Sequence, residues 1–445
     1  MGGADSVRHG YHDINRPELV ELVPLDAKNI LDLGCGTGLL GRALKNRQRC
    51  HVTGIELSKD AAAAAEQNID AVFNDNLNRF NPTFLKSRFD CLIFGDILEH
   101  LINPWSVLEK FSSTLTDNGC IVASLPNIAH PHIVNQLHRG LFRYEPAGIL
   151  DVTHLRFFTK SSIFQMFVRA GLKIVNVRPW PNAENPIQYH VCAVKARIPF
   201  RDPTTTILIL THNGLEWTRR CIASIKAKTQ SPYKILVVDN GSTDGTVDYL
   251  RSELSIQHIE NDCNHGFARG FNIGLMCVTT PYFVLANNDV LVTKNWLSTM
   301  LTSIKSDDKL LVLGVRSNNV SGSQIVKPID YTDARSLEAF AAAHADAQPV
   351  RLTFYPRIVF FFVMIKTEAL QHIGFLDEIF GIGNFEDDDY CFRVARRGYK
   401  CAFDNKVFIH HWGSQTFKAT KIDYAKLMAE NKAKFEKKWK LRGPV

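Results

Sequence analysis

The chain has 445 residues and a formal net charge of +7, with 45% hydrophobic and 22% charged residues. This length exceeds one ordinary domain, and the composition excludes a largely disordered, collagen-like or coiled-coil protein. The mild positive charge suits anionic ligands, but it is too weak and too dispersed to indicate a nucleic-acid partner.

Apolar runs alternate with helical segments along the whole chain. In the first half we expect strands at 29–33, 51–57, 89–94, 119–125, 172–178 and 189–194, and helices at 39–44, 59–67, 104–115 and 161–170. This alternation predicts a parallel sheet covered by helices on both faces. The pattern restarts with strands at 206–211 and 234–239 around a helix at 217–226. We therefore expect an α/β fold of two domains, residues 1–197 and 205–445, joined by a linker at 198–204.

A glycine-rich turn follows the first predicted strand. It has the pattern Asp-x-Gly-x-Gly-x-Gly, formed by Asp32, Gly34, Gly36 and Gly38. Glu56 ends the next predicted strand, 24 residues after Asp32. Glycines allow the backbone to approach a ligand closely, and an acid at the second strand end suits ribose hydroxyls. A carboxylate just before the turn would repel a pyrophosphate but can pair with an ammonium group, which disfavours a dinucleotide.

This pattern resembles motif I of the class I S-adenosylmethionine-dependent methyltransferases, over about residues 10–195. The resemblance implies a Rossmann-like sheet in which the glycine turn lines S-adenosylmethionine and Glu56 holds its ribose. It also implies that Asp75 lies on the adenine side and that Asp96 lies beside the methyl group. Residues 126–130, 142–145 and 148–159 resemble a subgroup found in cell-surface polysaccharide clusters, such as those for O-antigen.

Methylation of a hydroxyl needs a general base near the acceptor, which typically contributes 10²–10⁴ in rate. Three histidines are candidates, His100, His130 and His154. His154 is favoured because Asp151 and Arg156 flank it. The alternative for each is a histidine that caps or anchors a loop.

The second half carries four polar segments, at residues 239–245, 264–272, 284–290 and 385–390. The first and third follow apolar strands, and a plain turn is the alternative for the first. The second is glycine-rich in the manner of a ligand loop. The fourth places four acids side by side, from Glu386 to Asp389. Adjacent carboxylates repel one another, and such clusters typically serve a cation or a proton transfer.

Together these segments resemble the GT-A glycosyltransferases of family 2, which invert the configuration at the sugar, over about residues 204–440. The resemblance implies a site for a nucleotide-sugar donor. Its expected residues are Thr211, Asn213, Asp239, Asn264, Arg269, Asn272 and Asn288. Asn287 and Asp289 occupy the position of the family's DxD metal motif, where Mg²⁺ or Mn²⁺ is expected, and Asn287 replaces the first Asp. His411 or His410 would add a contact to the metal or diphosphate.

The same resemblance implies the catalytic acids. Asp387 would deprotonate the acceptor hydroxyl in a single in-line displacement, and Glu386 would help to fix the acceptor. The metal and hydrogen-bond donors would stabilise the departing nucleoside diphosphate. Trp296 is expected in the core rather than as a platform for a sugar.

The sequence thus predicts a bifunctional enzyme of glycan assembly. It would transfer a sugar to a polysaccharide or lipid-linked acceptor and O-methylate a sugar hydroxyl. One alternative keeps the glycosyltransferase and makes the first domain a non-catalytic cofactor-binding module. Another is a glycan-binding scaffold without catalysis, which Asp289, Glu386 and Asp387 disfavour because binding needs no carboxylate cluster.

Three further patterns bear on location. Residues 421–442 mix lysines with aromatic residues at helical spacing, which predicts a helix packed on the catalytic domain or, less favoured, one on an anionic membrane. The longest apolar run, residues 358–365, is far short of the roughly 20 residues of a spanning helix, so we expect a buried strand and no transmembrane segment. Ten scattered cysteines without a C-x-x-C pair, and no apolar signal segment, favour a cytoplasmic protein, at the inner membrane face for a lipid-linked acceptor.

Overall fold

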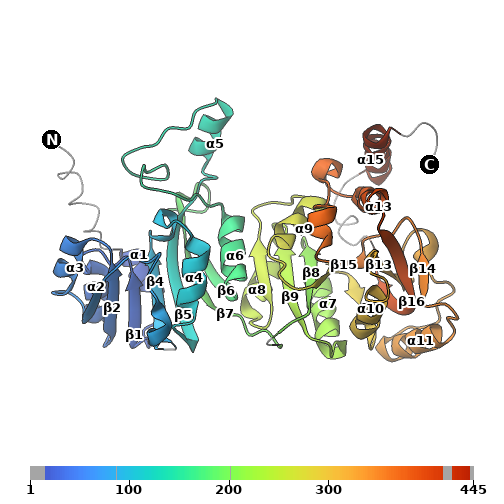
Figure 1. The fold of residues 1–445 in the computed structure, drawn as a ribbon, viewed down its shortest axis with the longest axis horizontal. Coiled ribbons are helices and arrows are strands. Elements are labelled where there is room, and N and C mark those ends of the chain that lie inside the picture. Colours follow the sequence, from blue (N-terminus) through green and yellow to red (C-terminus); the bar gives the residue numbers. More distant parts are fainter. Residues whose placement is uncertain (1–15, 87, 201, 414–422, 441–445) are drawn as a thin grey trace. The chain divides into compact units, whose positions relative to one another are not determined.

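The computed structural model describes residues 16–86, 88–200, 202–413 and 423–440 (Figure 1). The chain divides between Ala196 and Arg197 into two compact units. The predicted start of the first domain and both ends of the predicted tail helix lie outside the described residues. None of the described helices is long and apolar enough to cross a lipid bilayer. None of the ten cysteines, all of which lie in the described ranges, forms a disulfide bond.

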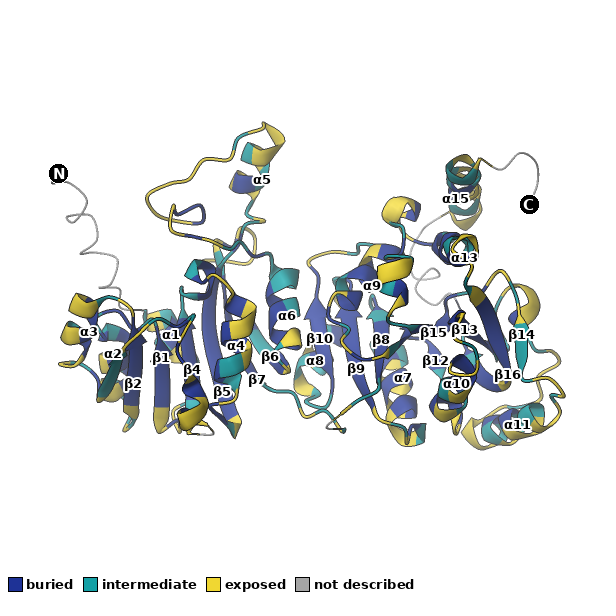
Figure 2. Cartoon of the chain, in the orientation of Figure 1, coloured by how far each residue is buried: buried dark blue, intermediate teal, exposed yellow. Residues whose placement is uncertain are grey.

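The first unit holds a seven-stranded sheet in the order β3-β2-β1-β4-β5-β7-β6. Its strands are β1 Asn29–Leu33, β2 His51–Glu56, β3 Ala71–Asn74, β4 Phe89–Gly95, β5 Leu115–Pro126, β6 Leu172–Trp180 and β7 Gln188–Lys195. Its helices are α1 Pro17–Leu22, α2 Leu39–Arg47, α3 Lys59–Ala65, α4 Pro104–Ser112, α5 Pro131–His138 and α6 Lys160–Arg169, with 3-10 turns η1 Pro82–Leu85 and η2 Leu98–His100. The central strands are buried because helices cover both faces of their apolar runs (Figure 2).

The first five strands are parallel, but β7 pairs antiparallel with both β5 and β6. The expectation of an entirely parallel sheet is therefore wrong at this edge. The reason is the connection, because β6 and β7 are joined directly by residues 181–187 without a crossover helix. A short connection of this kind permits only antiparallel neighbours.

The strand order of the first unit reverses beside β1, the kind of position at which α/β sheets form a crevice. The chain proceeds from β1 to β3 on one side and then places β4 and β5 on the other side of β1. Ligands bind at such a reversal, outside the carboxyl ends of the two strands that flank it. The arm formed by residues 127–158, which carries α5, projects beyond the carboxyl end of β5, and much of it is exposed (Figures 1 and 2).

The second unit holds a nine-stranded mixed sheet in the order β10-β9-β8-β11-β15-β13-β16-β12, with β14 paired to β16. Its strands are β8 Thr205–Thr211, β9 Tyr233–Asp239, β10 Gln257–Glu260, β11 Tyr282–Asn287, β12 Val290–Leu291, β13 Leu310–Ser317, β14 Leu352–Phe354, β15 Phe362–Lys366 and β16 Lys400–His411. Its helices are α7 Leu215–Lys228, α8 Thr246–Ser252, α9 Phe267–Leu275, α10 Trp296–Ile304, α11 Ala334–Asp346, α12 Ala369–His372, α13 Glu386–Arg396 and α15 Tyr424–Trp439, with η3 Gly322–Gln324 and η4 Glu378–Phe380. Here the reversal lies between β8 and β11.

The core of the second unit contains Trp296 and most of the long apolar run at 358–365. Trp296 is buried, and its indole N–H donates to the Thr229 hydroxyl at 2.9 Å. The apolar run at 358–365 is buried except for the half-buried Val359, but the strand begins only at Phe362. Ahead of it, the Val359 and Phe360 amides donate to side chains, the Gln324 carbonyl at 2.8 Å and the Asp387 carboxylate at 3.4 Å, instead of to a neighbouring strand.

Candidate active sites in the two units

The glycine turn of the first unit lies at the carboxyl end of β1. Gly34, Gly36 and Gly38 have φ values of 79°, 53° and 79°, a backbone conformation that residues with a side chain rarely adopt. A Cβ atom on Gly34 would lie 2.7 Å from Cδ1 of Ile97, which follows β4. Glycine is therefore required both by the backbone conformation and by the close approach of the two strand ends.

Glu56 supports this turn directly. One oxygen of its buried carboxylate accepts the Gly36 amide at 2.9 Å, and the other accepts the Ser58 amide at 2.8 Å. Asp75 lies next to Glu56, since its amide donates to the Glu56 carbonyl at 3.0 Å, and its side chain is exposed. The predicted ribose-binding and adenine-side acids thus adjoin one another at the carboxyl end of β2.

Two more acids flank the crevice between β1 and β4. Asp32 is buried, and burial raises its pKa to about 7, although the Arg16 guanidinium acts in the opposite direction. Asp96 has a φ of 47°, and its amide donates to the Ser124 hydroxyl at 2.9 Å. Its carboxylate accepts hydrogen bonds from Ser124 and Arg16. The buried Asp32 and the half-buried Asp96, which pairs with Arg16, favour a cationic group at this edge of the sheet.

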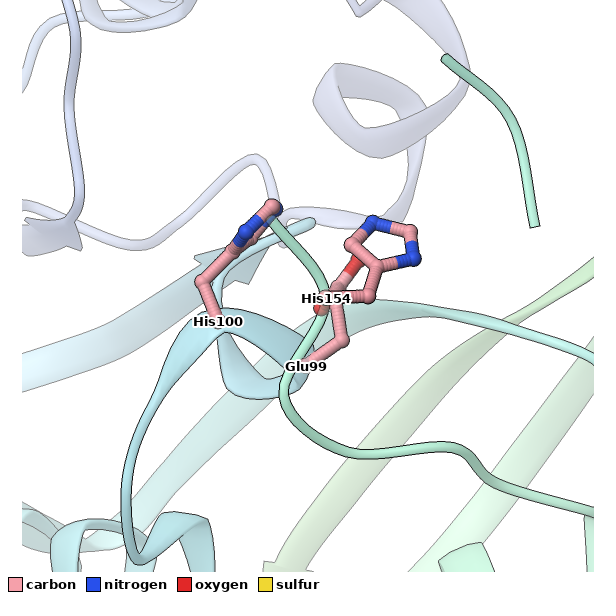
Figure 3. A group of neighbouring side chains, drawn as sticks. All are labelled: Glu99, His100 and His154. Atoms are coloured by element: carbon pink, nitrogen blue, oxygen red, sulfur yellow. The ribbon is translucent and has the colours of Figure 1, made fainter. Parts of the chain in front are cut away.

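The three candidate histidines have different surroundings. His130 caps α5, because its ring nitrogen accepts the His132 amide at 3.3 Å, and this matches the alternative of a capping residue. His100 and His154 instead lie together with Glu99, at the turn that follows β4 (Figure 3). Burial and the neighbouring His154 lower the pKa of His100. Burial also raises the pKa of Glu99 to about 8.

The second unit contains a cavity of about 590 Å³ at the carboxyl ends of β8 and β11. It combines residues from both strand ends with the start of α13 and with α15. Its polar lining includes Thr211, His212, Asn240, Asn264, Asn287, Asn288, Asp289, Asn319, Arg357, Asn384, Glu386, Asp387, Asp388, His411 and Tyr424. A cavity of this size suits a small-molecule ligand.

The four adjacent acids separate into two kinds in the structure. Asp389 is fully buried away from the cavity and is neutralised by Arg393 at 2.9 Å and Lys438 at 2.5 Å. Asp388 pairs with Arg357 at 2.6 Å. Glu386 and Asp387 are buried at the cavity, and neither forms an ion pair among the described residues.

Burial sets the protonation of this pair. It raises the pKa of Asp387 to about 7; the Asp388 charge adds to the rise and the Arg357 charge opposes it. Burial and Asp387 hold the pKa of Glu386 well above its usual range. A carboxylate whose pKa lies near neutrality can accept a proton from a hydroxyl and is suited to general base catalysis.

Asp289 and His411 form a second group of polar atoms in the cavity. The Nδ1 atom of His411 lies 2.7 Å from the Asn319 carbonyl, which can only accept, so Nδ1 carries the hydrogen. In the neutral ring Nε2 is then an acceptor, 3.2 Å from a carboxylate oxygen of Asp289. Two acceptors so close together favour a cation between them, and this donor set fits a divalent metal ion. His410 instead bonds to the Tyr331 hydroxyl at 2.7 Å and does not line the cavity.

The segment before α13 is strained, and α15 holds it. Asn384 and Phe385 have φ values of 75° and 74°, which are unfavourable for side-chain-bearing residues. The Asn431 side-chain amide of α15 donates to the carbonyls of Phe380 and Gly383 at 2.8 Å and to that of Asn384 at 3.2 Å. The described part of the tail helix therefore packs on the second unit and fixes the turn that leads to Glu386 and Asp387.

Family comparisons assign the two units. A model described as a methyltransferase domain matches residues 8–177, and the model of glycosyl transferase family 2 matches residues 206–374. The chain carries a methyltransferase domain and a family 2 glycosyltransferase domain. The two-domain α/β architecture expected from the sequence is confirmed.

Relatives match each domain separately. A Haemophilus influenzae protein named an uncharacterized glycosyltransferase is 28% identical over 116 residues, which are 25% of this chain and 36% of the relative. The ubiquinone biosynthesis O-methyltransferase of Aeromonas salmonicida is 28% identical over 158 residues, which are 34% of this chain and 65% of the relative. The chain thus spans less than two thirds of the length of either relative.

Solved structures resemble parts of the chain more distantly. A Pyrobaculum calidifontis mannosyltransferase, in complex with GDP-Man and Mn²⁺, has 17% identity and a TM-score of 0.38, and covers 56% of this chain and 68% of its own. An S-adenosylmethionine-dependent methyltransferase from Mesorhizobium loti has 17% identity and a TM-score of 0.32. The match covers 40% of this chain and 95% of that methyltransferase.

In the glycosyltransferase domain, the structure brings many of the predicted site residues to one cavity. Those that line it are Thr211, Asn264, Asn287, Asn288, Asp289, Glu386, Asp387 and His411. Asn213, Asp239, Arg269 and Asn272 do not line it. The side-chain oxygen of Asn213 accepts a hydrogen bond from the Thr243 amide at 2.8 Å. The Asp239 carboxylate accepts hydrogen bonds from the Gly241 and Ser242 amides. Asn272 bonds to the backbone of Leu376, and Arg269 is exposed.

Sequence reasoning missed Glu99 in the methyltransferase domain and Asn431 in the glycosyltransferase domain. Glu99 stands beside the candidate His100, but a single Glu in a turn carries no sign that it will be buried. Asn431 lies in a lysine-rich helical segment. Its one signal in the sequence was a polar asparagine at a position that faces inward on the predicted helix.

Proposed function

We propose that the glycosyltransferase domain transfers a sugar from a nucleotide-sugar donor to a glycan hydroxyl with inversion at the sugar. The observation that supports this most directly is the buried Asp387 carboxylate, which forms no ion pair among the described residues and lies in the same cavity as Asp289 and His411. In a single displacement Asp387 takes the proton of the acceptor hydroxyl, and Glu386 beside it orients the acceptor.

The other polar residues of the cavity would hold the donor. Asp289 and His411, with Asn287 next to them, would bind Mg²⁺ or Mn²⁺, which neutralises charge on a nucleoside diphosphate. Thr211, Asn264 and Asn288 would contact the nucleotide sugar. The proposal extends to Asn213, Asp239, Arg269 and Asn272, which do not line the cavity.

We also propose that the methyltransferase domain O-methylates a sugar hydroxyl with S-adenosylmethionine. The cofactor supplies an electrophilic methyl group when it is bound. The glycine turn and Glu56 would hold its ribose side, with Asp75 towards the adenine, and Asp32 and Asp96 would face its charged part. His154 is the proposed base: its Nδ1 lies 3.0 Å from the Ile149 carbonyl, which leaves Nε2 able to accept a proton.

The two reactions together fit the assembly of a methylated polysaccharide or lipid-linked saccharide. The protein would then act in the cytoplasm, at the inner face of the cell membrane if the acceptor is lipid-linked.

Calorimetric titration tests both sites at once. The purified chain is titrated with S-adenosylmethionine and then with a panel of nucleoside diphosphates in the presence of Mn²⁺. Two independent active sites require saturable binding of both ligand classes, with each lost only when its own domain is mutated. Binding of the nucleotide alone would reduce the first domain to a non-catalytic module, and absence of nucleotide binding would refute sugar transfer.

A further inference from the structure

Three potential metal ligands meet in the methyltransferase domain. Glu99 and His100 belong to η2, the turn directly after β4, and His154 belongs to the arm formed by residues 127–158 (Figure 3). One donor atom from each side chain lies within 4.8 Å of the donor atoms of the other two. The structure therefore brings together three chemically suitable groups from two segments that are 54 residues apart in the sequence.

Glu99 is the least satisfied of the three. Its side chain is fully buried, and within the described part of the chain neither carboxylate oxygen has a hydrogen-bond partner. A buried carboxylate is strongly unfavourable when ionised unless a cation or a metal ion compensates it. The Glu99 carboxyl group, with neither oxygen partnered among the described residues, thus lies at a site that also contains two imidazoles.

Backbone contacts fix the tautomers of both histidines. The Nδ1 atom of His154 lies 3.0 Å from the Ile149 carbonyl, and that of His100 lies 3.2 Å from the Thr153 carbonyl. Because a carbonyl only accepts, each Nδ1 carries the hydrogen, and in the neutral ring Nε2 bears the lone pair. Metal-binding histidines are commonly oriented in this way, by donating the other ring N–H to a carbonyl oxygen.

The two segments that carry these groups are fastened together. The Glu99 carbonyl accepts the Leu155 amide at 2.8 Å and the Arg156 amide at 3.0 Å. The Arg156 guanidinium donates to the Ile102 carbonyl at 2.6 Å on the far side of η2. The relative positions of Glu99, His100 and His154 are therefore set by the backbone, and little further ordering is needed to bind an ion.

We propose that Glu99, His100 and His154 bind one divalent transition-metal ion. Two imidazoles and one carboxylate are donors that Zn²⁺, Mn²⁺, Fe²⁺ and Co²⁺ accept. Bonds of about 2.0–2.2 Å place donor atoms up to about 4 Å apart around an ion, so side-chain shifts of less than about 1 Å complete the set. Three protein ligands leave coordination positions open for water or a ligand oxygen.

The cluster lies close in the sequence to residues that flank the proposed cofactor site, and the step that follows rests on the proposed methyl transfer. Asp96, three residues before Glu99, flanks the same crevice as the glycine turn, and Ile97 approaches Gly34. An ion here would coordinate the acceptor hydroxyl and lower its pKa. The lone pair of His154 would then serve the ion, so its role as base applies to the metal-free protein.

Co²⁺ binding by the full chain tests the site without reference to activity. The protein, freed of any affinity tag and dialysed against a chelator, is titrated with Co²⁺, whose d–d absorption and bound amount are measured. All variants carry Asp289→Asn, which removes the other cation site proposed here. Glu99→Gln, His100→Gln and His154→Gln are compared with His138→Gln, an exposed histidine of the same arm at the end of α5.

The expected result is one bound Co²⁺ in the Asp289→Asn chain and in the His138→Gln control. Each of the three cluster variants should weaken binding at least tenfold, the lower end of what the loss of an outer-shell partner costs. His100 is only partly buried, so His100→Gln remains decisive if Glu99→Gln does not fold.

Two results would overturn the proposal. One is the absence of bound Co²⁺ in the Asp289→Asn chain, and the other is the same affinity in His100→Gln and His154→Gln as in the control. The proposal would also be overturned if the only Co²⁺ signal were a thiolate-to-metal absorption band, because that band would come from a cysteine such as the exposed Cys263. A chain that binds Co²⁺ through the cluster but methylates no glycan would keep the metal site and refute only the methyl transfer.

Discussion

The proposed role of Asp387 as the base of sugar transfer predicts a pH-dependent reaction, because burial raises the pKa of this carboxyl. With a pKa of about 7, this carboxyl is about one tenth ionised at pH 6 and about nine tenths ionised at pH 8. Because a base works only when it is ionised, donor turnover should rise about tenfold over this range. A carboxyl with an ordinary pKa would give a flat profile between the same limits.

Two neighbouring charges should move this profile in opposite directions. Asp388 raises the pKa of Asp387 and Arg357 lowers it. Asp388→Asn should therefore shift the rise to lower pH, and Arg357→Gln should shift it to higher pH. Asp387→Asn should lower the rate of donor turnover about 10²–10⁴-fold at every pH, which is the usual contribution of a general base.

The assay is release of nucleoside diphosphate from a panel of nucleotide sugars with Mn²⁺, which requires no knowledge of the acceptor. The Glu56→Ala variant, altered only in the methyltransferase domain, is the matched control and should keep the full profile. A flat wild-type profile between pH 6 and pH 8, or an Asp387→Asn variant with most of its activity, would show that Asp387 is not the base.

Four other predictions concern single side chains. Glu56→Ala deprives the buried Gly36 amide of its acceptor, worth about 1–3 kcal/mol, so S-adenosylmethionine binding should weaken about fivefold to 150-fold by calorimetry; equal affinity would show that the first site has been misassigned. Gly266→Ala places a Cβ against the Gly381 carbonyl at a φ of 80°, so the melting temperature of the glycosyltransferase domain should fall, by the equivalent of about 1–3 kcal/mol, and an unchanged transition would contradict this. In the metal-free protein the folded state holds the Glu99 proton up to about pH 8, whereas the unfolded chain releases it near pH 4.5. The free energy of unfolding should therefore fall by up to about 5 kcal/mol as the pH rises between these values, and denaturant melts of Glu99→Gln should not show this pH dependence. Asn431→Ala leaves three carbonyls of the turn before α13 without their donor, so nucleoside diphosphate release should drop while S-adenosylmethionine binding stays constant, and undiminished release would refute the positioning role.

Local signals in the sequence were enough to predict the framework of both domains. The strand, glycine turn, helix and acid between Asn29 and Glu56 form one continuous unit, and each part is encoded by its own residue types. The antiparallel edge was not predictable in the same way. Apolar runs at 172–178 and 189–194 look alike in either direction, and only the length of the connection between them determines how they pair.

The sites were harder to predict than the framework because they depend on orientation. Residues on a helix are separated by 100° of rotation, so the four acids from Glu386 to Asp389 cannot all face one cavity. The sequence shows them as one cluster, whereas the fold turns Asp389 inward to Arg393 and Lys438. Likewise, Glu99 and His154 come together only because the arm after β5 folds back onto η2.

The contact between Asn431 and the turn before α13 also has a consequence for the order in which the protein matures on the ribosome. Asn431 is added 44 residues after Asp387, which at about 5–20 residues per second is a delay of about 2–9 s. During that interval the proposed base, Asp387, has been synthesised, but the turn before α13 lacks its contact with Asn431. The methyltransferase domain contains no such late element among its described residues, since its last strand ends at Lys195. A nascent chain would therefore be able to bind S-adenosylmethionine well before it is competent to transfer a sugar.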